Sequence, residues 1–259
     1  KMFDLDILVN KDAISDGSFK LGVICSEDVD NCTVSDVWIE KVKIYSEVRL
    51  DNELGNHGIT FTRSDIDNQG NFTNINVKDC DMKLYGNSIY GFHLQQTGKN
   101  INVSNNTMEL TANLSAPSDA YNTIACYGDS EDINITDNKV YGGGHSPIAV
   151  STAGKAIIKG NFVYNSTVVS EAGIGILVTD RLNTSSSKSP KNVIISNNII
   201  KNSISSDIEV TSSFSAAGDD THRISEVIIS GNQALSSCDG ANIRVRDASN
   251  LKIINNICD

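Results

Sequence analysis

Several residue types and patterns that would decide between protein classes are scarce in this chain of 259 residues. It has 3 prolines, 1 tryptophan and 6% aromatic residues, and stretches rich in helix-favouring residues are few. No apolar run approaches the roughly 20 residues that a membrane-spanning helix needs, so we expect no membrane partner. We find no signal peptide, and because the chain opens at Lys1 we expect a processed piece of a longer protein.

The chain also has few positively charged residues relative to acidic ones, and it lacks metal-binding cysteine patterns. The 21 lysines and arginines stand against 32 aspartates and glutamates, which gives a net charge of −11. Such a chain is repelled by nucleic-acid phosphates and anionic lipids, so we expect no nucleic-acid partner. The six cysteines show no CxxC and no zinc spacing. We therefore expect mostly free, buried thiols and no metal site, with a Cys25–Cys32 bridge as the main alternative.

Asn, Ser, Thr, Ile and Val are plentiful instead, which favours β structure with many turns. They form a repeated pattern, apolar-x-apolar-x-Asn-Asn-x-apolar, of which "NVIISNNIIKNS" at 192–203 is a clear copy. The second turn position falls at residues 42, 80, 106, 138, 161, 198, 232 and 256, so the intervals run from 23 to 38 residues. Six of these positions are asparagine, and the others are Val42 and Cys80.

Repeats of this length indicate a solenoid, a propeller or an array, and their alternating apolar residues indicate strands. A propeller blade needs about 40 residues and hairpin turns, whereas these intervals are mostly shorter and leave no room for an ordinary helix. We therefore predict an all-β, single-stranded parallel β-helix of about eight coils. Asparagine tolerates the left-handed φ of a tight corner, and stacked amides about 4.8 Å apart would hydrogen-bond as an internal ladder.

The repeat resembles the right-handed parallel β-helix of pectate lyases, polygalacturonases and phage tailspikes, in which an asparagine column in the short turn is characteristic. The resemblance covers about Phe19 to Asp259, within a single domain spanning 1–259. Few prolines and coils rich in Asn, Ser and Thr make tailspikes the most similar group. The resemblance implies a polysaccharide substrate, a homotrimer or further domains of the same chain, and a place outside the cell or on a virion.

A second apolar-x-apolar unit lies between the asparagine corners. In the resembled families this unit forms the sheet whose outer face binds sugar. Because its flanking residues point inward, we predict that the middle one points outward. This outward column reads Gly22, Thr60, His93, Ala125, Ala149, Gly175, Glu209 and Arg244. Parallel columns two residues away would include Tyr127 and Arg246 after it and Asp207 before it.

Four long insertions interrupt the repeats, at 46–56, 109–122, 179–191 and 211–226. Long loops in a tight solenoid are usually functional or disordered. Three of the four would wall the same outer face around the middle and later coils. We therefore predict a groove on this face.

Asp207 and Glu209 are predicted to share that face, roughly 6–7 Å apart between Cα atoms. Such a pair could act as general acid with a base or nucleophile in glycosidic cleavage. The alternative is a solvated polar face, or ion pairs from these acids to Arg244 and Arg246 in the next coil.

Asp180, Arg181, Asp219 and Asp220 lie on two of the long insertions. They could supply a second carboxylate, a cation for an acidic sugar, or ligands for calcium, the one cofactor that we consider. The alternative is that they are ordinary charged loop residues.

His145, in "YGGGHSPIAVS", resembles the histidine of the polygalacturonase Gly-His-Gly segment. The paired aspartates of that family are missing, and "NIRVRD" only faintly matches its Arg-Ile-Lys segment, so we do not transfer its chemistry. We treat His145 as a sugar contact, with an ordinary loop residue as the alternative. His93 and Tyr127 could stack on sugar rings, although a lone exposed aromatic is equally normal.

The function that we predict is acid–base hydrolysis of a bacterial surface polysaccharide. The calcium cluster of pectate lyases is not recognisable in the sequence. A lyase or epimerase for uronic-acid polymers, with Arg244 or Arg246 as base, is the second hypothesis. A non-catalytic glycan-binding spike or adhesin is the third.

Overall fold

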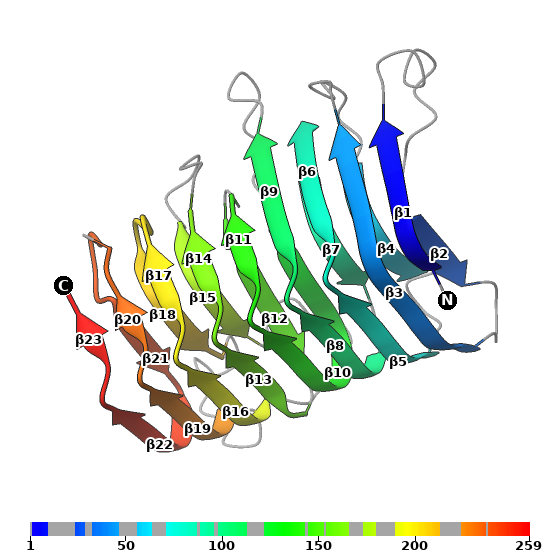
Figure 1. Cartoon of the computed structure of the whole chain (residues 1–259). Helices are drawn as coiled ribbons and strands as arrows, with labels where there is room; N and C mark the ends of the chain where they lie inside the picture. Colours follow the sequence, from blue (N-terminus) through cyan, green and yellow to red (C-terminus); the bar gives the residue numbers. More distant parts are fainter. Residues whose placement is uncertain are drawn as a thin grey trace.

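The computed structural model describes residues 2–9, 24–28, 33–46, 56–63, 71–86, 89–95, 98–112, 122–142, 145–152, 154–165, 173–179, 190–212, 224–236 and 238–259. Every element among them is a β-strand, and each strand pairs in parallel with its neighbours. The prediction of an all-β fold is confirmed, and stacked parallel sheets are consistent with a parallel β-helix (Figure 1). Within the described residues no helix is long and apolar enough to cross a membrane.

The strands form two sheets. Sheet B takes one short strand from each repeat: β2 (Ile24–Asp28), β4 (Asn56–Arg63), β7 (Ile89–Gln95), the first part of β10 (Ile124–Thr136), β12 (Ile148–Thr152), β15 (Ile174–Thr179), β18 (Ser206–Thr211) and β21 (Ile243–Arg246).

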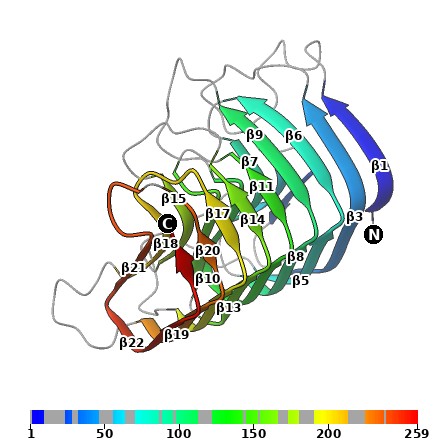
Figure 2. The ribbon, with the colours of Figure 1, turned by 60° about the vertical axis from the view of Figure 1, so that its left-hand side comes forward.

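Sheet A is larger, because most repeats add two strands to it, one on each side of the asparagine corner. Those before or through the corner are β1 (Met2–Val9), β3 (Thr33–Ser46), β5 (Asn71–Lys78), β8 (Gly98–Ser104), the second part of β10, β13 (Ala156–Lys159), β16 (Lys191–Ser196), β19 (Ile224–Ser230) and β22 (Ala248–Ile254). Those after the corner are β6 (Asp81–Gly86), β9 (Thr107–Ala112), β11 (Lys139–Tyr141), β14 (Phe162–Tyr164), β17 (Ile199–Lys201), β20 (Gln233–Ala234) and β23 (Ile257–Cys258). Figure 2 shows the strands of successive repeats lying side by side along the molecule.

The core lies between the two sheets and is filled by the alternate apolar residues of the repeat. In sheet A, Ile75, Ile101, Ile133 and Ala156 are successive register partners, and all four are fully buried. Successive repeats therefore place equivalent side chains in single columns. Cys80 and Cys126 belong to this core as free thiols, whereas Cys238 is half-buried and Cys258 exposed.

The two residues of the asparagine corner have different roles: the first adopts the left-handed backbone conformation, and the second places its amide in the core. The first corner residue takes the left-handed φ, as at Asn105 (54°), Asp137 (56°), Gly160 (70°) and Asn197 (55°). We expected the stacking asparagine to bear this conformation, and that detail is wrong. Freed from the left-handed requirement, the second residue can turn its amide into the core.

The second corner residues are joined by hydrogen bonds from repeat to repeat. In every member but the last, Asn256, the side-chain Nδ2 donates to the Oδ1 of the next member at 2.9 or 3.0 Å. In all of them it also donates to a backbone carbonyl at 2.9 to 3.1 Å. The Oδ1 of Asn106 accepts a bond from the backbone N–H of Cys80, and each later Oδ1 accepts one from the preceding member's backbone N–H, so these polar groups are satisfied. We call this set the asparagine column: Asn106, Asn138, Asn161, Asn198, Asn232 and Asn256.

The strands of sheet B start at a second corner, where the alternation of inward-facing and outward-facing residues is interrupted. A Cβ added at Gly58 or Gly91 would meet the core sulfur of Met82 or Met108 at 3.0 or 2.9 Å, so this position points inward. The next position, Ile59 or Phe92, is also buried in the core. Two consecutive residues therefore face inward, and the position before the apolar-x-apolar unit does not lie on the outer face.

The register of sheet B differs from the prediction in two strands. In β15 the unit aligned with its neighbours is Ile176-Leu177-Val178, because Ile176 pairs with Ile148 and Ile208. In β2 it begins at Ile24, which pairs with Ile59, so the predicted Gly22 falls outside the described residues. Leu177 takes the outward place predicted for Gly175, which instead faces inward.

Gly175 gives a direct test of that register. A Cβ there would lie 2.4 Å from Ile200 Cγ2 and 2.6 Å from the carbonyl oxygen of Asp207, and the backbone cannot easily yield. We expect Gly175→Ala to lower the free energy of unfolding by about 3 kcal/mol in urea denaturation, as overpacking does. Gly173→Ala is the control, since its Cβ would meet Ile204 only at 3.2 to 3.4 Å. Equal effects of the two changes would contradict this register.

Candidate functional site

The candidate site is the outer face of sheet B, where the sequence predicts a sugar-binding groove. The outward column of this face is now known to contain Thr60, His93, Ala125, Ala149, Leu177, Glu209 and Arg244. All but Arg244 are buried, with exposed fractions of 7% or less. The expectation that these side chains lie open to solvent is therefore wrong along β4 to β18.

Asp207 does not share a face with Glu209, and this prediction is wrong. Asp207 lies at the inward corner position, in register with Gly175, and is fully buried. Its carboxylate accepts hydrogen bonds from the backbone N–H and hydroxyl of Ser236 and from Asn242 Nδ2, at 3.1 Å for the N–H and 3.0 Å for the amide. The side chain thus ties its own corner to the next repeat.

Asp207 should consequently behave as a structural residue. We expect Asp207→Ala to lower the free energy of unfolding by about 2–4 kcal/mol, because buried donors of Ser236 and Asn242 lose their acceptor. Binding of any glycan at temperatures where the variant is folded should be unchanged. If the Asp207→Asn protein were stable but had lost glycan cleavage, Asp207 would have a catalytic role and the structural assignment would be wrong.

Glu209 retains the outward direction that the sequence predicts. Its carboxylate lies 3.4 Å from Arg244 Nη1, and the two residues are register partners on β18 and β21. This is the alternative foreseen for the acid, an ion pair between neighbouring repeats. Arg244 is partly exposed, and Arg246, the register partner of Thr211, is exposed. Solvent therefore reaches this end of the face through the two arginines.

A cluster of rings covers the other end of the face, on β4, β7 and β10. We call His57, Tyr90, His93 and Tyr127 the ring cluster. His93 stacks on Tyr90, with centroids 4.2 Å apart and planes at 12°, and meets His57 and Tyr127 edge-on at 4.8 and 5.5 Å. The hydroxyls of Tyr90 and Tyr127 interact, and Tyr127 also accepts a hydrogen bond from Asn122.

The ring cluster is uncharged at neutral pH because its rings are wholly or partly buried. Burial lowers the pKa of His57 to about 4 and that of His93 to about 3, and the nearby His57 lowers the latter further. Burial also raises the pKa of Tyr90 and of Tyr127. The strand pattern predicts His93 and Tyr127 as site residues but not His57 and Tyr90, which precede the apolar-x-apolar unit of their strands. The signal that could have found them is a shared sequence pattern, because each is an aromatic ring residue directly before a glycine, Gly58 or Gly91.

Of the remaining predicted site residues the structure describes His145, which is not part of the ring cluster or of the Glu209–Arg244 pair. His145 lies half-buried before β12, with its Nδ1 3.0 Å from the hydroxyl of Ser146. Four further predicted site residues lie outside the described residues: Asp180, Arg181, Asp219 and Asp220. Within the described chain no group of three or more His, Cys, Asp or Glu side chains could hold a metal ion.

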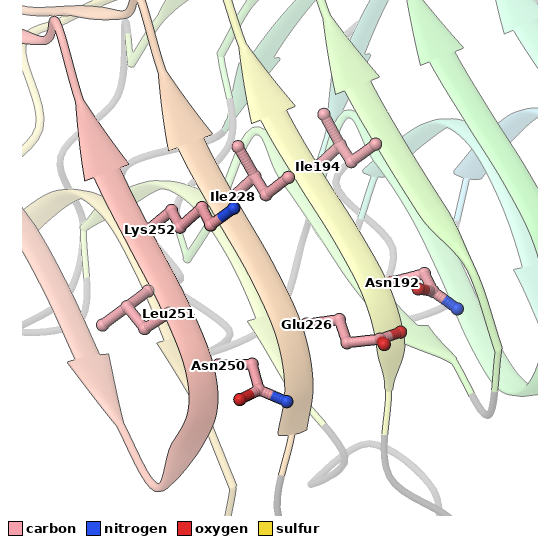
Figure 3. A pocket seen from close by; sticks show the side chains of 7 residues that line it. All are labelled: Asn192, Ile194, Glu226, Ile228, Asn250, Leu251 and Lys252. Carbon is pink, nitrogen blue, oxygen red and sulfur yellow. The ribbon is translucent and has the colours of Figure 1, made fainter.

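A separate hollow of about 550 Å³ lies on the outer face of sheet A (Figure 3). Its lining includes Ile194 and Ile228, together with Asn192, Glu226 and Asn250, all three of which have left-handed φ. The same outward column carries hydrogen-bonded Asn76, Asn102 and Asn134 in earlier repeats. The hollow holds a single carboxylate, so it offers no acid–base pair for hydrolysis.

No family model matches the chain, and neither a curated protein nor a solved structure matches it.

Proposed function

We propose that the chain is a right-handed parallel β-helix of about eight coils with an internal asparagine ladder, of the pectin-lyase-like kind. Its activity is to bind a polysaccharide along the outer face of sheet B and to hydrolyse it, as a tailspike-like depolymerase does. The hydrogen bonds of the asparagine column and the matching register of successive repeats support the fold. We propose that the protein acts outside the cell or on the surface of a virion, where it would meet such a polysaccharide.

The observation that carries the activity is the Glu209–Arg244 pair. Among the described residues it is the ion pair on the outer face of sheet B, and solvent reaches it through the arginine. An ion-paired carboxylate is suited to the role of base or nucleophile, and Arg244 is suited to orient a sugar hydroxyl or carboxylate. The long insertions 179–191 and 211–226 begin where β15 and β18 end, so their acids are the candidates for the second carboxylate.

Glu209→Gln tests this activity, with Glu226→Gln on sheet A as the matched control. Capsular and cell-wall glycans are incubated with each protein and the products are sized. The proposal expects cleavage by the wild type and by Glu226→Gln, and at least a 100-fold loss in Glu209→Gln with unchanged thermal unfolding, as for loss of a catalytic carboxylate. Products absorbing in the ultraviolet as unsaturated uronates would favour the lyase or epimerase instead.

One observation favours a second function, a non-catalytic glycan-binding spike. With Asp207 facing inward, Glu209 has no second carboxylate beside it on sheet B within the described chain. Glycan binding by the wild type without turnover would establish this function, and absence of binding to every glycan would overturn both. The homotrimer stays a prediction, which sedimentation velocity at several concentrations would check.

A further inference from the structure

The sheet A strands that follow the asparagine corner carry aromatic rings on their outer face. In β11 and β14 the middle residues, Val140 and Val163, are fully buried in the core, so the residues on either side of them point outward. These outward residues include Tyr141, Phe162 and Tyr164. Tyr164 is 37% exposed, and the other two rings are partly exposed. We call these three residues the aromatic patch.

The aromatic patch is continuous because β11, β14 and β17 are neighbours in the sheet (Figure 1). Tyr141 and Tyr164 are register partners, about 4.8 Å apart across the strands. The ring centroids of Tyr141 and Phe162 lie 5.7 Å apart. Ile199, the register partner of Phe162, is partly exposed and extends the apolar surface. Exposed apolar side chains that adjoin one another and are bordered by polar ones mark binding surfaces.

Positive charge borders the aromatic patch, although the chain as a whole has a net charge of −11. The register partners of the three rings include the exposed residues Lys139 and Lys201, and also Glu109. The carboxylate of Glu109 lies 3.2 Å from the Nζ of Lys83. These four charged residues are three lysines and one glutamate, so they favour an anionic ligand.

We propose that the aromatic patch is a second glycan site, which binds a chain carrying acidic groups and does not cleave it. An aromatic ring packs against the apolar C–H face of a sugar, and a tyrosine also offers a hydroxyl for hydrogen bonding. Lys139 and Lys201 would attract the acidic groups at the edges of the rings. The carboxylate of Glu109 is paired with Lys83, so the patch offers no acid–base pair within the described chain.

A second copy of this chain suits the aromatic patch less well than a glycan does. A stable interface takes roughly 20–30 residues from each partner, and its apolar centre is depleted in lysine. Here three rings and Ile199 lie between charged side chains. From Glu109 to Lys201 there are three strand steps, or roughly 14 Å, which suits a short stretch of an extended chain.

The experiment records fluorine NMR spectra of the full chain with its 7 tyrosines replaced by 3-fluorotyrosine. The signals of Tyr141 and Tyr164 are assigned by changing each tyrosine to phenylalanine. Oligosaccharides of alginate provide carboxylates, those of carrageenan provide sulfates, and dextran is the neutral probe. We expect at least one acidic probe to shift both signals, and dextran to shift neither at the same concentration.

Substitution of the rings gives the size of the effect. The double variant Tyr141→Thr, Tyr164→Thr should bind the acidic probe at least about 10-fold more weakly in calorimetry, as for the loss of aromatic anchors. Threonine is suited to an exposed strand position, so the fold should persist. Trp38→Thr is the matched control, because Trp38 is 42% exposed on another strand of sheet A. Its affinity should equal that of the wild type.

Substitution of the lysines tests the acidic groups of the ligand. Lys139→Gln with Lys201→Gln should weaken binding of the acidic probe and reduce the dependence of its affinity on salt. Lys191→Gln is the control, since Lys191 is an exposed lysine on β16, before the asparagine corner. It should change neither quantity.

Acidic glycans that leave the signals of Tyr141 and Tyr164 unchanged would overturn the proposal, and so would equal affinity for dextran. Self-association of the wild type that the double tyrosine variant abolishes would assign the surface to a second copy instead. Shifts confined to Tyr90 and Tyr127 would place the glycan on sheet B, in favour of the proposed function alone. Shifts of the patch signals without cleavage of any glycan would establish this site while hydrolysis through Glu209 failed.

Discussion

Asn161→Ala is expected to lower the free energy of unfolding by about 3–5 kcal/mol, the largest effect of any single side chain considered. The change removes a buried amide that donates to Asn198 Oδ1 and Ile135 O, both at 2.9 Å, and accepts from the backbone and side chain of Asn138. Buried donors and acceptors left without partners cost about 1–3 kcal/mol each. Urea denaturation followed by circular dichroism measures the difference.

Asn197→Gly is the matched control one residue earlier in the corner of the next repeat. Asn197 is exposed and has a φ of 55°, and the equivalent positions in flanking repeats are already Gly160 and Gly231. Glycine adopts this conformation readily, so we expect a change below about 1 kcal/mol. If Asn161→Ala were no more destabilising than Asn197→Gly, the asparagine column would not stabilise the core.

Acid should destabilise this protein through the ring cluster, even before its carboxylates are protonated. His57 and His93 have folded-state pKa values of about 4 and about 3, below the ordinary value of about 6.5 in an unfolded chain. Protons therefore bind the unfolded chain first. The stability that these neutral rings contribute is complete above pH 6.5 and is lost as the pH falls from about 6.5 toward 4 and then 3.

We expect this loss to reach about 3–5 kcal/mol between pH 7.5 and pH 4.5, allowing for the partial exposure of His57. The double variant His57→Asn, His93→Asn should show a correspondingly flatter dependence of unfolding free energy on pH. Parallel pH curves for the wild type and the double variant would show that the two rings are not buried as neutral groups.

The architecture could be predicted because the repeat encodes it locally. All eight sheet A units aligned in the sequence, from Val37 to Leu251, are register partners in the structure. Sheet B was misaligned at β15 because "IGILV" contains two overlapping apolar-x-apolar units. The glycine before Ile59, Phe92 and Ile176 would have resolved the choice, since a glycine fits the crowded inward corner.

The candidate site was harder to predict because the alternation of residues along a strand gives the direction of a side chain. It does not tell whether other residues bury that side chain. Glu209 and Arg244 were placed correctly as neighbours across strands, and strand spacing sufficed for that. Asp207 was placed on the wrong face because the double inward step at the sheet B corner breaks the period of two. Small outward residues such as Ala125 and Ala149 were a sign of a covered face.

The central claim is that equivalent residues of successive repeats lie in one column, about 4.8 Å apart. Spin labels on its outward face measure this directly by pulsed electron paramagnetic resonance, in a background whose 6 cysteines are replaced. Labels replacing Asn102 and Ile228 are four register steps apart, and labels replacing Asn76 and Lys252 are six. We predict mean distances of about 19 Å for the first pair and about 29 Å for the second. Equal distances, or a shorter one for the second pair, would contradict the stacking of repeats.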